Sequence, residues 1–222
     1  PPPPPEGLSA GDRERWAEVV ERAAAIEREN YFEMLGVSQG ASSEEVRKAY
    51  LEQVKRWHPD RLPEALAALR PHVERIFRYL TRANETLTSD DQRGKYLVTV
   101  QDGGGTPESE RQLGRVVQAA MEFRKVEVLM RRRSWDEALA LVEEILGLNE
   151  EEPDYHATRG WLLFQRAGGA EKAAPDALAS IDRALQLAED HDRAHYYKGM
   201  ILKRTGHPTD ALRHFERAAE IN

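Results

Sequence analysis

Residues 42–60 read SSEEVRKAYLEQVKRWHPD, and this stretch decides how the first half of the chain folds. Ser42 and Glu45 are spaced as a capping pair that begins a helix. An apolar stripe with spacings of four and three residues follows, formed by Val46, Tyr50, Val54 and Trp57. Pro59 disfavours helical geometry at the residue before it, so the helix must stop at His58 and lead into a polar turn.

Helices are also expected on both sides of this stretch. Asn30 and Glu33 form a second capping pair, which predicts a short helix over residues 31–35. Beyond the turn, apolar residues at helical spacing predict a helix over 71–87, and a shorter one fits 90–97. Two helices with apolar stripes on either side of a tight turn should pack against each other as an antiparallel hairpin.

The composition predicts a helical protein and excludes several functional classes. Charged residues make up 32% and hydrophobic residues 40%, mostly Ala, Leu and Val, so we predict an all-α fold. The chain has no Cys, which excludes thiol chemistry and thiolate metal sites, and no apolar run approaches the roughly 18–20 residues of a membrane span. A net charge of -7 disfavours nucleic-acid binding. We therefore expect a cytoplasmic protein that binds neither membrane nor nucleic acid and holds no metal or cofactor.

Four features in residues 30–97 occur together in a specific order. They are the segment Tyr31-Phe32-Glu33-Met34-Leu35-Gly36-Val37, the helix with Glu45-Val46-Arg47-Lys48-Ala49-Tyr50, the turn His58-Pro59-Asp60, and the helix with Phe77, Leu80, Ala83, Glu85 and Leu87. An isolated His-Pro-Asp triplet is a weak signal, but its position between two partner helices is specific. The segment resembles a J domain, the module by which DnaJ-type co-chaperones engage DnaK.

The resemblance implies that the turn couples this segment to ATP hydrolysis by a DnaK-type chaperone, with basic residues of the preceding helix aiding the docking. The implied contact residues are His58, Pro59, Asp60, Arg47, Lys48, Tyr50, Lys55 and Arg56. Residue chemistry agrees, because the Asp60 carboxylate suits an arginine on a partner. A catalytic role for His58 is disfavoured, since no nucleophile or Gly-rich loop accompanies it, and we expect no enzymatic activity.

Two departures from the J-domain pattern keep a second hypothesis open. Leu51 and Glu52 stand where family members often carry basic residues, which should weaken electrostatic steering toward DnaK. The connection after Asp60 is about five residues longer than in the bacterial DnaJ pattern. The alternative to a stimulating co-chaperone is therefore a structural interaction module of a larger regulatory protein, with a J-like fold that no longer stimulates ATP hydrolysis.

The chain divides into four parts by composition. Residues 1–29 read as the end of a Pro-rich linker and an amphipathic helix, whose apolar stripe is Trp16, Val19, Val20 and Ala23. The J-like segment is 30–98, and three consecutive glycines and a proline mark 99–114 as a flexible linker. Because the chain opens with Pro1 and stops inside a helical pattern, we expect it to be part of something longer.

Residues 115–222 contain an internal repeat. Ala177 and Ala184 recur as Ala211 and Ala218, each 34 residues later, which is the period of a helix-turn-helix repeat. Gly160 and Gly199 occupy the small position of the first helix, where another helix must approach closely. This part resembles about three tetratricopeptide repeats, and the resemblance implies a groove that holds a client or partner protein.

The groove residues and two histidines remain as candidate binding groups. At the positions that clamp a carboxylate in one tetratricopeptide subclass, this chain has Phe123, Glu127, Thr158, Arg193 and Tyr197. Since only Arg193 suits a carboxylate, we expect a groove of aromatic and neutral character, although packing explains Phe123 and Tyr197 equally well. His191 and His195 are four residues apart, a spacing that allows two metal ligands on one helical face. No third ligand lies nearby in sequence, so we favour ordinary solvent-facing histidines over a metal site.

Overall fold

The computed structural model describes residues 3–222, and within that range it contains α-helices and short 3-10 helices without a strand. The all-α prediction is confirmed. Two compact units divide the chain, Pro1–Gln112 and Leu113–Asn222. Pro1 and Pro2, the start of the predicted Pro-rich linker, lie outside the described residues.

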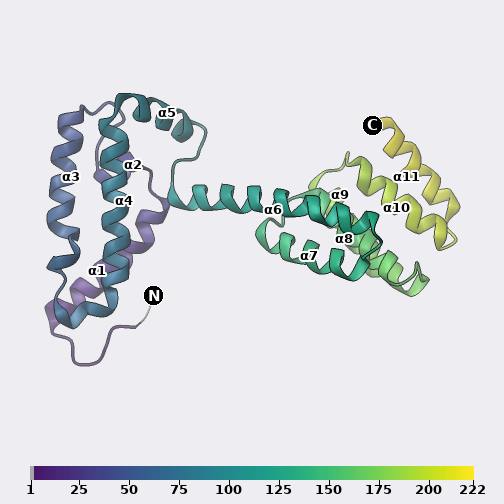
Figure 1. Cartoon of the computed structure of the whole chain (residues 1–222), viewed down its shortest axis with the longest axis horizontal. Coiled ribbons are helices and arrows are strands. Elements are labelled where there is room, and N and C mark those ends of the chain that lie inside the picture. Colours follow the sequence, from purple (N-terminus) through teal and green to yellow (C-terminus); the bar gives the residue numbers. More distant parts are fainter. Residues whose placement is uncertain (1–2) are drawn as a thin grey trace. The chain divides into compact units, whose positions relative to one another are not determined.

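The first unit is built around an antiparallel helix hairpin (Figure 1). Its elements are α1 (Ala10–Ala25), η1 (Ile26–Arg28), α2 (Tyr31–Leu35), α3 (Ser43–Trp57), η2 (Pro59–Arg61), η3 (Glu64–Leu69), α4 (Arg70–Thr88) and α5 (Asp90–Gln101). The two capping pairs at Asn30 and Ser42 form as predicted, each with reciprocal side-chain and backbone hydrogen bonds. α3 and α4 form the hairpin, and α2 packs on α4.

The amphipathic helix α1 belongs to the core of the first unit. Val19 and Ile26 have no exposed surface, and Trp16 is 4% exposed. The helix contacts α4 and η3, and in η3 both Leu66 and Leu69 are completely buried. The longer connection after the turn is therefore not a plain insertion, because it supplies the apolar surface on which α1 packs.

Residues 99–114 differ from the flexible linker that three glycines suggested. α5 continues to Gln101, and α6 (Pro107–Arg131) begins only a few residues later. The intervening turn is tied to the unit, because the Tyr96 hydroxyl donates to the Gly105 carbonyl oxygen and accepts the Tyr31 backbone N–H. Gly105 has φ +83°, so glycine here serves a tight turn.

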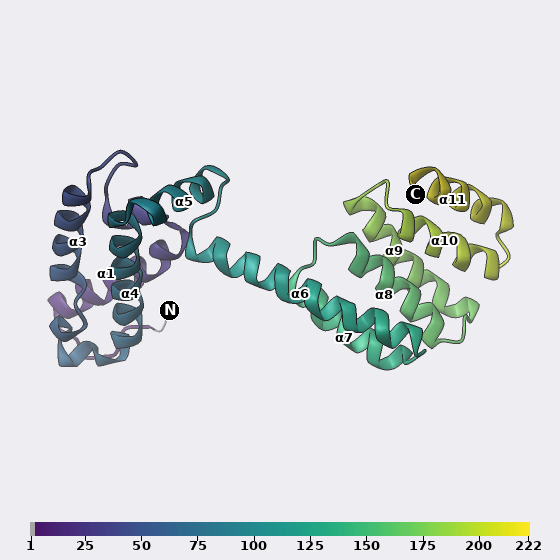
Figure 2. The same cartoon turned by 45° about the horizontal axis from the view of Figure 1, so that its top comes forward.

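The second unit consists of three consecutive helix pairs, as the repeat prediction requires (Figure 2). They are α6 with α7 (Trp135–Leu148), α8 (Pro153–Arg166) with α9 (Ala174–Leu187), and α10 (Asp192–Arg204) with α11 (Pro208–Ile221). A short η4 (Glu171–Ala173) lies between α8 and α9. A Cβ atom on Gly160 would lie 2.5 Å from the Ala177 carbonyl oxygen, which confirms the close helix approach expected there.

Candidate partner-binding site at the end of α3

The turn after α3 has a defined geometry. Helix α3 ends at His58, whose φ of -69° and ψ of 129° are extended, as Pro59 demands. His58 Nδ1 accepts the backbone N–H of Asp60 at 3.2 Å. The Asp60 side chain is 82% exposed and lies 3.7 Å from the His58 ring nitrogen. Among residues 3–222, the Asp60 carboxylate has no hydrogen bond or ion pair closer than this one.

Both helices of the hairpin hold this turn in place. The His58 ring packs edge-on against Phe77 of α4, with ring centroids 5.3 Å apart. Arg61 reaches back and donates to the Lys55 carbonyl oxygen at 2.7 Å, which satisfies a carbonyl group at the end of α3. His58 is consequently only partly exposed, and its ring is oriented before any partner arrives.

The basic residues predicted on α3 are solvent-exposed. Arg47, Lys48, Lys55 and Arg56 all lie on the surface. Tyr50 is half-buried against α4, and its hydroxyl lies 3.2 Å from Thr81 Oγ1, so its contact with a partner stays a prediction. Its position within the apolar stripe explains this burial, so Tyr50 holds the hairpin together.

The two residues that depart from the basic pattern are also on the surface of α3. Leu51 is 58% exposed, and Glu52 is exposed beside it. An apolar and an acidic side chain thus interrupt the positive surface that leads to the turn. These two side chains lower the positive electrostatic potential of the α3 surface and leave the geometry of the turn unchanged.

Sequence reasoning missed two residues of α1 that meet the end of α3. Glu18 accepts a hydrogen bond from Arg56 Nε at 2.6 Å, and Arg15 donates to the Arg56 carbonyl oxygen. The Arg15 guanidinium also lies over the Trp57 ring, 4.6 Å from its centroid. The apolar stripe of α1 indicated that the helix packs on something, but no local signal identified its partner.

Comparison with known families agrees with this geometry. The DnaJ domain family matches residues 30–96, which begin at the capping residue of α2 and end within α5. Residues 30–96 are a J domain. The match starts after α1, so α1 lies outside the part of the chain that the family defines.

Similar curated proteins extend the comparison. Over 70 residues the chain is 43% identical to the chaperone protein DnaJ of Thermotoga neapolitana, an alignment that covers 32% of this chain and 18% of that protein. It is 36% identical over 80 residues to human DnaJ homolog subfamily B member 7, covering 35% of this chain and 25% of that one. The chain thus matches about a quarter or less of the length of these relatives.

The second unit contains a tetratricopeptide repeat, which the family match places at residues 192–222, over α10 and α11. Of the predicted groove residues, Phe123 is 9% exposed and its ring packs on Tyr155 with centroids 4.8 Å apart. Thr158 has no exposed surface. Both side chains therefore lie in the interior between packed helices and contribute little to the surface of a groove.

The remaining groove residues connect all three helix pairs of the repeat unit. Arg193 lies 3.2 Å from Asp154 and 3.6 Å from Glu127. The hydrogen bond from His191 lowers the pKa of Asp154, the Arg193 charge adds to this effect, and partial burial opposes it. Tyr197 stacks on Trp161 with ring centroids 5.0 Å apart. Arg193 is thus already paired with carboxylates of its own chain, which disfavours a carboxylate clamp.

The two histidines considered as metal ligands have separate partners. His191 accepts the Ala194 N–H at the start of α10, whereas His195 lies with its Nδ1 3.0 Å from that of His214 in α11. The sequence favoured solvent-facing side chains, but both histidines are only partly exposed and contact other residues of the chain. Residues 3–222 contain no group of three or more potential ligand side chains placed to hold a metal, and no helix among them is long and apolar enough to span a membrane.

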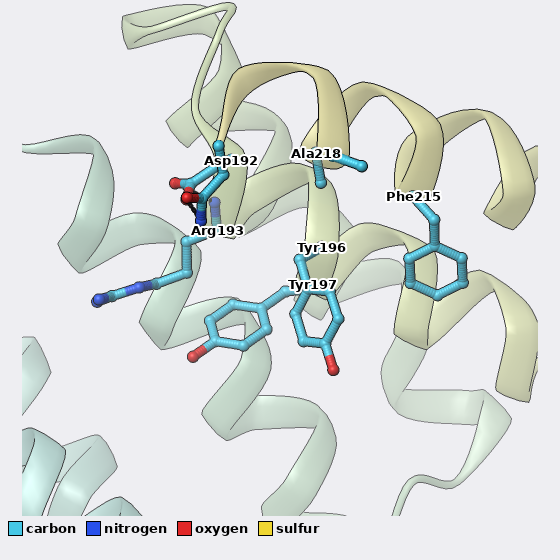
Figure 3. Close-up of a pocket in the computed structure, with 8 residues that line it drawn as sticks. Asp192, Arg193, Tyr196, Tyr197, Phe215 and Ala218 are labelled. Atoms are coloured by element: carbon cyan, nitrogen blue, oxygen red, sulfur yellow. Dashed lines mark hydrogen bonds between the residues drawn. The ribbon is translucent and has the colours of Figure 1, made fainter.

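A hollow of about 660 Å³ lies on α10 and α11 (Figure 3). Its aromatic lining comes from Tyr196 and Tyr197 of α10 and Phe215 of α11, and Tyr196 is 50% exposed. Arg193 and Asp192 border the same hollow. This hollow is therefore an exposed aromatic surface of the repeat unit. Of the predicted groove residues, Arg193 and Tyr197 line it.

Proposed function

We propose that this chain is a non-enzymatic co-chaperone adaptor, in which the J domain stimulates ATP hydrolysis by a DnaK-type chaperone while the repeats hold a client or partner protein. The observation that carries the proposal is the exposed Asp60 carboxylate. It lies in a turn where His58 accepts the Asp60 backbone N–H, at the end of a helix with four exposed basic residues. A carboxylate on a preorganised turn can form a charge-assisted pair with an arginine of the partner.

The repeats supply the second half of the proposal. Tetratricopeptide repeats bind partner proteins, and the aromatic hollow between α10 and α11 offers apolar surface beside a charged rim. Exposed Tyr side chains of this kind are enriched at protein interfaces, because the ring adds contact area at little entropic cost. The client is therefore expected to bring apolar side chains to this surface.

Single-turnover ATP hydrolysis by a cognate DnaK tests the proposal. The wild-type chain should accelerate hydrolysis, whereas His58→Gln or Asp60→Asn should remove the acceleration. The first change removes the ring nitrogen that accepts the Asp60 N–H, and the second removes the negative charge that the turn offers to the partner. Circular dichroism of the variants should remain that of the wild type, since neither side chain is buried. Equal hydrolysis rates for wild type and both variants would exclude the co-chaperone function.

The same assay decides the second candidate, a non-stimulating interaction module. Exposed Leu51 and Glu52 on the partner-facing helix favour this candidate. It predicts no acceleration by the wild type, with partner capture by the repeats intact. Under the leading proposal, changing both residues to lysine increases an acceleration that already exists.

A further inference from the structure

Helix α1 reaches the segment that immediately precedes the His-Pro-Asp turn. Glu18 Oε1 accepts hydrogen bonds from both Nε and Nη2 of Arg56, the Nε bond being 2.6 Å long. Arg15 pairs with Glu18 and also donates to the Arg56 carbonyl oxygen. The two guanidinium groups lie over the buried Trp57 ring, at 4.6 and 5.5 Å from its centroid.

The pair between Glu18 and Arg56 is held by a rigid backbone on both sides. On α1, Trp16 and Val19 flank Glu18 and are buried in the core, so the carboxylate is delivered by a helix that is already fixed. On α3, Trp57 beside Arg56 is 2% exposed. Ordering the two side chains therefore costs less entropy than in an isolated surface pair.

The electrostatics of Glu18 are consistent with a stable pair. Partial burial raises the pKa of the Glu18 carboxyl, but hydrogen bonds and attraction from Arg15 and Arg56 outweigh it, so the pKa is lowered overall. The carboxylate is thus charged near neutral pH. One negative charge sits between two arginines and compensates part of the positive charge at this end of α3.

Arg56 differs in this respect from the other basic residues of α3. Within residues 3–222, Arg47, Lys48 and Lys55 have no carboxylate within ion-pair distance, whereas Arg56 does. The Nε and Nη2 edge of a guanidinium is one that can bind a carboxylate in a bidentate manner, and in Arg56 Glu18 already occupies it. A partner carboxylate can reach this edge only by displacing Glu18.

We propose that Glu18 restrains Arg56 and that α1 thereby limits how strongly the J domain docks on its DnaK-type partner. This inference rests on the proposed function, since it concerns the same docking surface. α1 is then both a structural part of the unit and a built-in competitor for one of its contact residues. Removing the Glu18 charge frees Arg56 for the partner.

Affinity for DnaK, measured by titration at low salt, tests the inference in the full chain. Glu18→Gln should bind about two- to fivefold more tightly, the range that corresponds to one exposed ion pair. Glu21→Gln is the matched control, because Glu21 is an exposed carboxylate of the same helix that borders the same hollow as Arg56 but forms no ion pair with it. The variant therefore removes one negative charge near Arg56 and leaves the Glu18 pair intact. In an Arg56→Gln background, Glu18→Gln should have no further effect.

The outcomes separate this inference from the proposed function. Equal affinities for Glu18→Gln and Glu21→Gln, with a wild type that stimulates hydrolysis and a His58→Gln variant that does not, would overturn the inference and leave the function standing. A wild type that stimulates hydrolysis, with a Glu18→Gln variant that binds more tightly than both the wild type and Glu21→Gln, would support the inference and the proposed function together. If neither the wild type nor Glu18→Gln binds DnaK or stimulates hydrolysis, the inference and the proposed function are both overturned.

Discussion

Two glycines of the repeat unit let helices pack closely, and their surroundings differ. At Gly160 an added Cβ would lie 2.5 Å from a backbone carbonyl oxygen and 2.6 Å from Ile181, which is completely buried. At Gly199 the added atom would lie 2.7 Å from the ring of Phe215, a residue that is only partly buried. A backbone atom cannot move aside, whereas a partly exposed ring can rotate.

We therefore expect Gly160→Ala to destabilise the repeat unit and Gly199→Ala to have little effect. Overpacking of a buried site costs about 1–3 kcal/mol, and alanine returns up to about 1 kcal/mol of helix propensity at either position. The free energy of unfolding from urea titration checks the difference. Equal losses at both glycines would mean that Phe215 is held as firmly as the backbone of α9.

At the scale of the helices, the boundaries that local chemistry sets could be predicted, and the packing partners could not. The capping pair at Ser42 and the stop before Pro59 place α3 from sequence alone, because both signals act within one turn of helix. The start of α6 at Pro107 was missed, since three glycines suggested a loose tether while Tyr96 fixes the turn from a distance. A hydrogen bond between residues that are distant in sequence produces no periodic sequence pattern from which it could be predicted.

The same limit applies to the candidate site. The His58-Pro59-Asp60 triplet and the basic residues were found because they are contiguous or lie at helical spacing. Glu18 was missed because it is separated from Arg56 by 38 residues and pairs with it only through the packing of α1. Thr158 was assigned to a groove by its position in the repeat, but its burial depends on how tightly α8 meets its neighbours.

Helix α1 provides the prediction at this scale. Trp16 is 4% exposed in a core that α1 shares with α4 and η3, although α1 precedes the family-defined J domain. Trp16→Ala should therefore lower the free energy of unfolding of the first unit by about 3–5 kcal/mol, the usual cost of truncating a buried tryptophan. Urea unfolding followed by circular dichroism measures it, with Arg13→Ala on the exposed side as control. A loss below about 1 kcal/mol would show that α1 is dispensable for folding.

For the molecule as a whole, the folding unit and the family-defined domain have different limits. The compact unit extends to Gln112, whereas the J-domain match covers residues 30–96. Beyond the match, the first turn of α6 forms three ion pairs with the rest of the unit: Arg28 with Glu108, Arg82 with Glu110, and Glu27 with Arg111. A division of the chain after residue 112 keeps all three pairs and the core around α1.

A fragment of residues 1–112 should therefore fold cooperatively and stimulate DnaK in single-turnover assays as well as the whole chain does. A fragment of residues 30–96 should be several kcal/mol less stable, because it loses Trp16, Val19 and Ile26, each worth roughly 1.5–3 kcal/mol of burial. Thermal unfolding compares the stabilities, and His58→Gln in the longer fragment controls for unspecific stimulation.

If residues 1–112 fold but do not stimulate while the whole chain does, the repeats take part in the encounter with DnaK itself, and the division of labour between the two units is not the one proposed. If the short fragment proves equally stable, the burial of α1 contributes little, and its effect on Arg56 would be its main role.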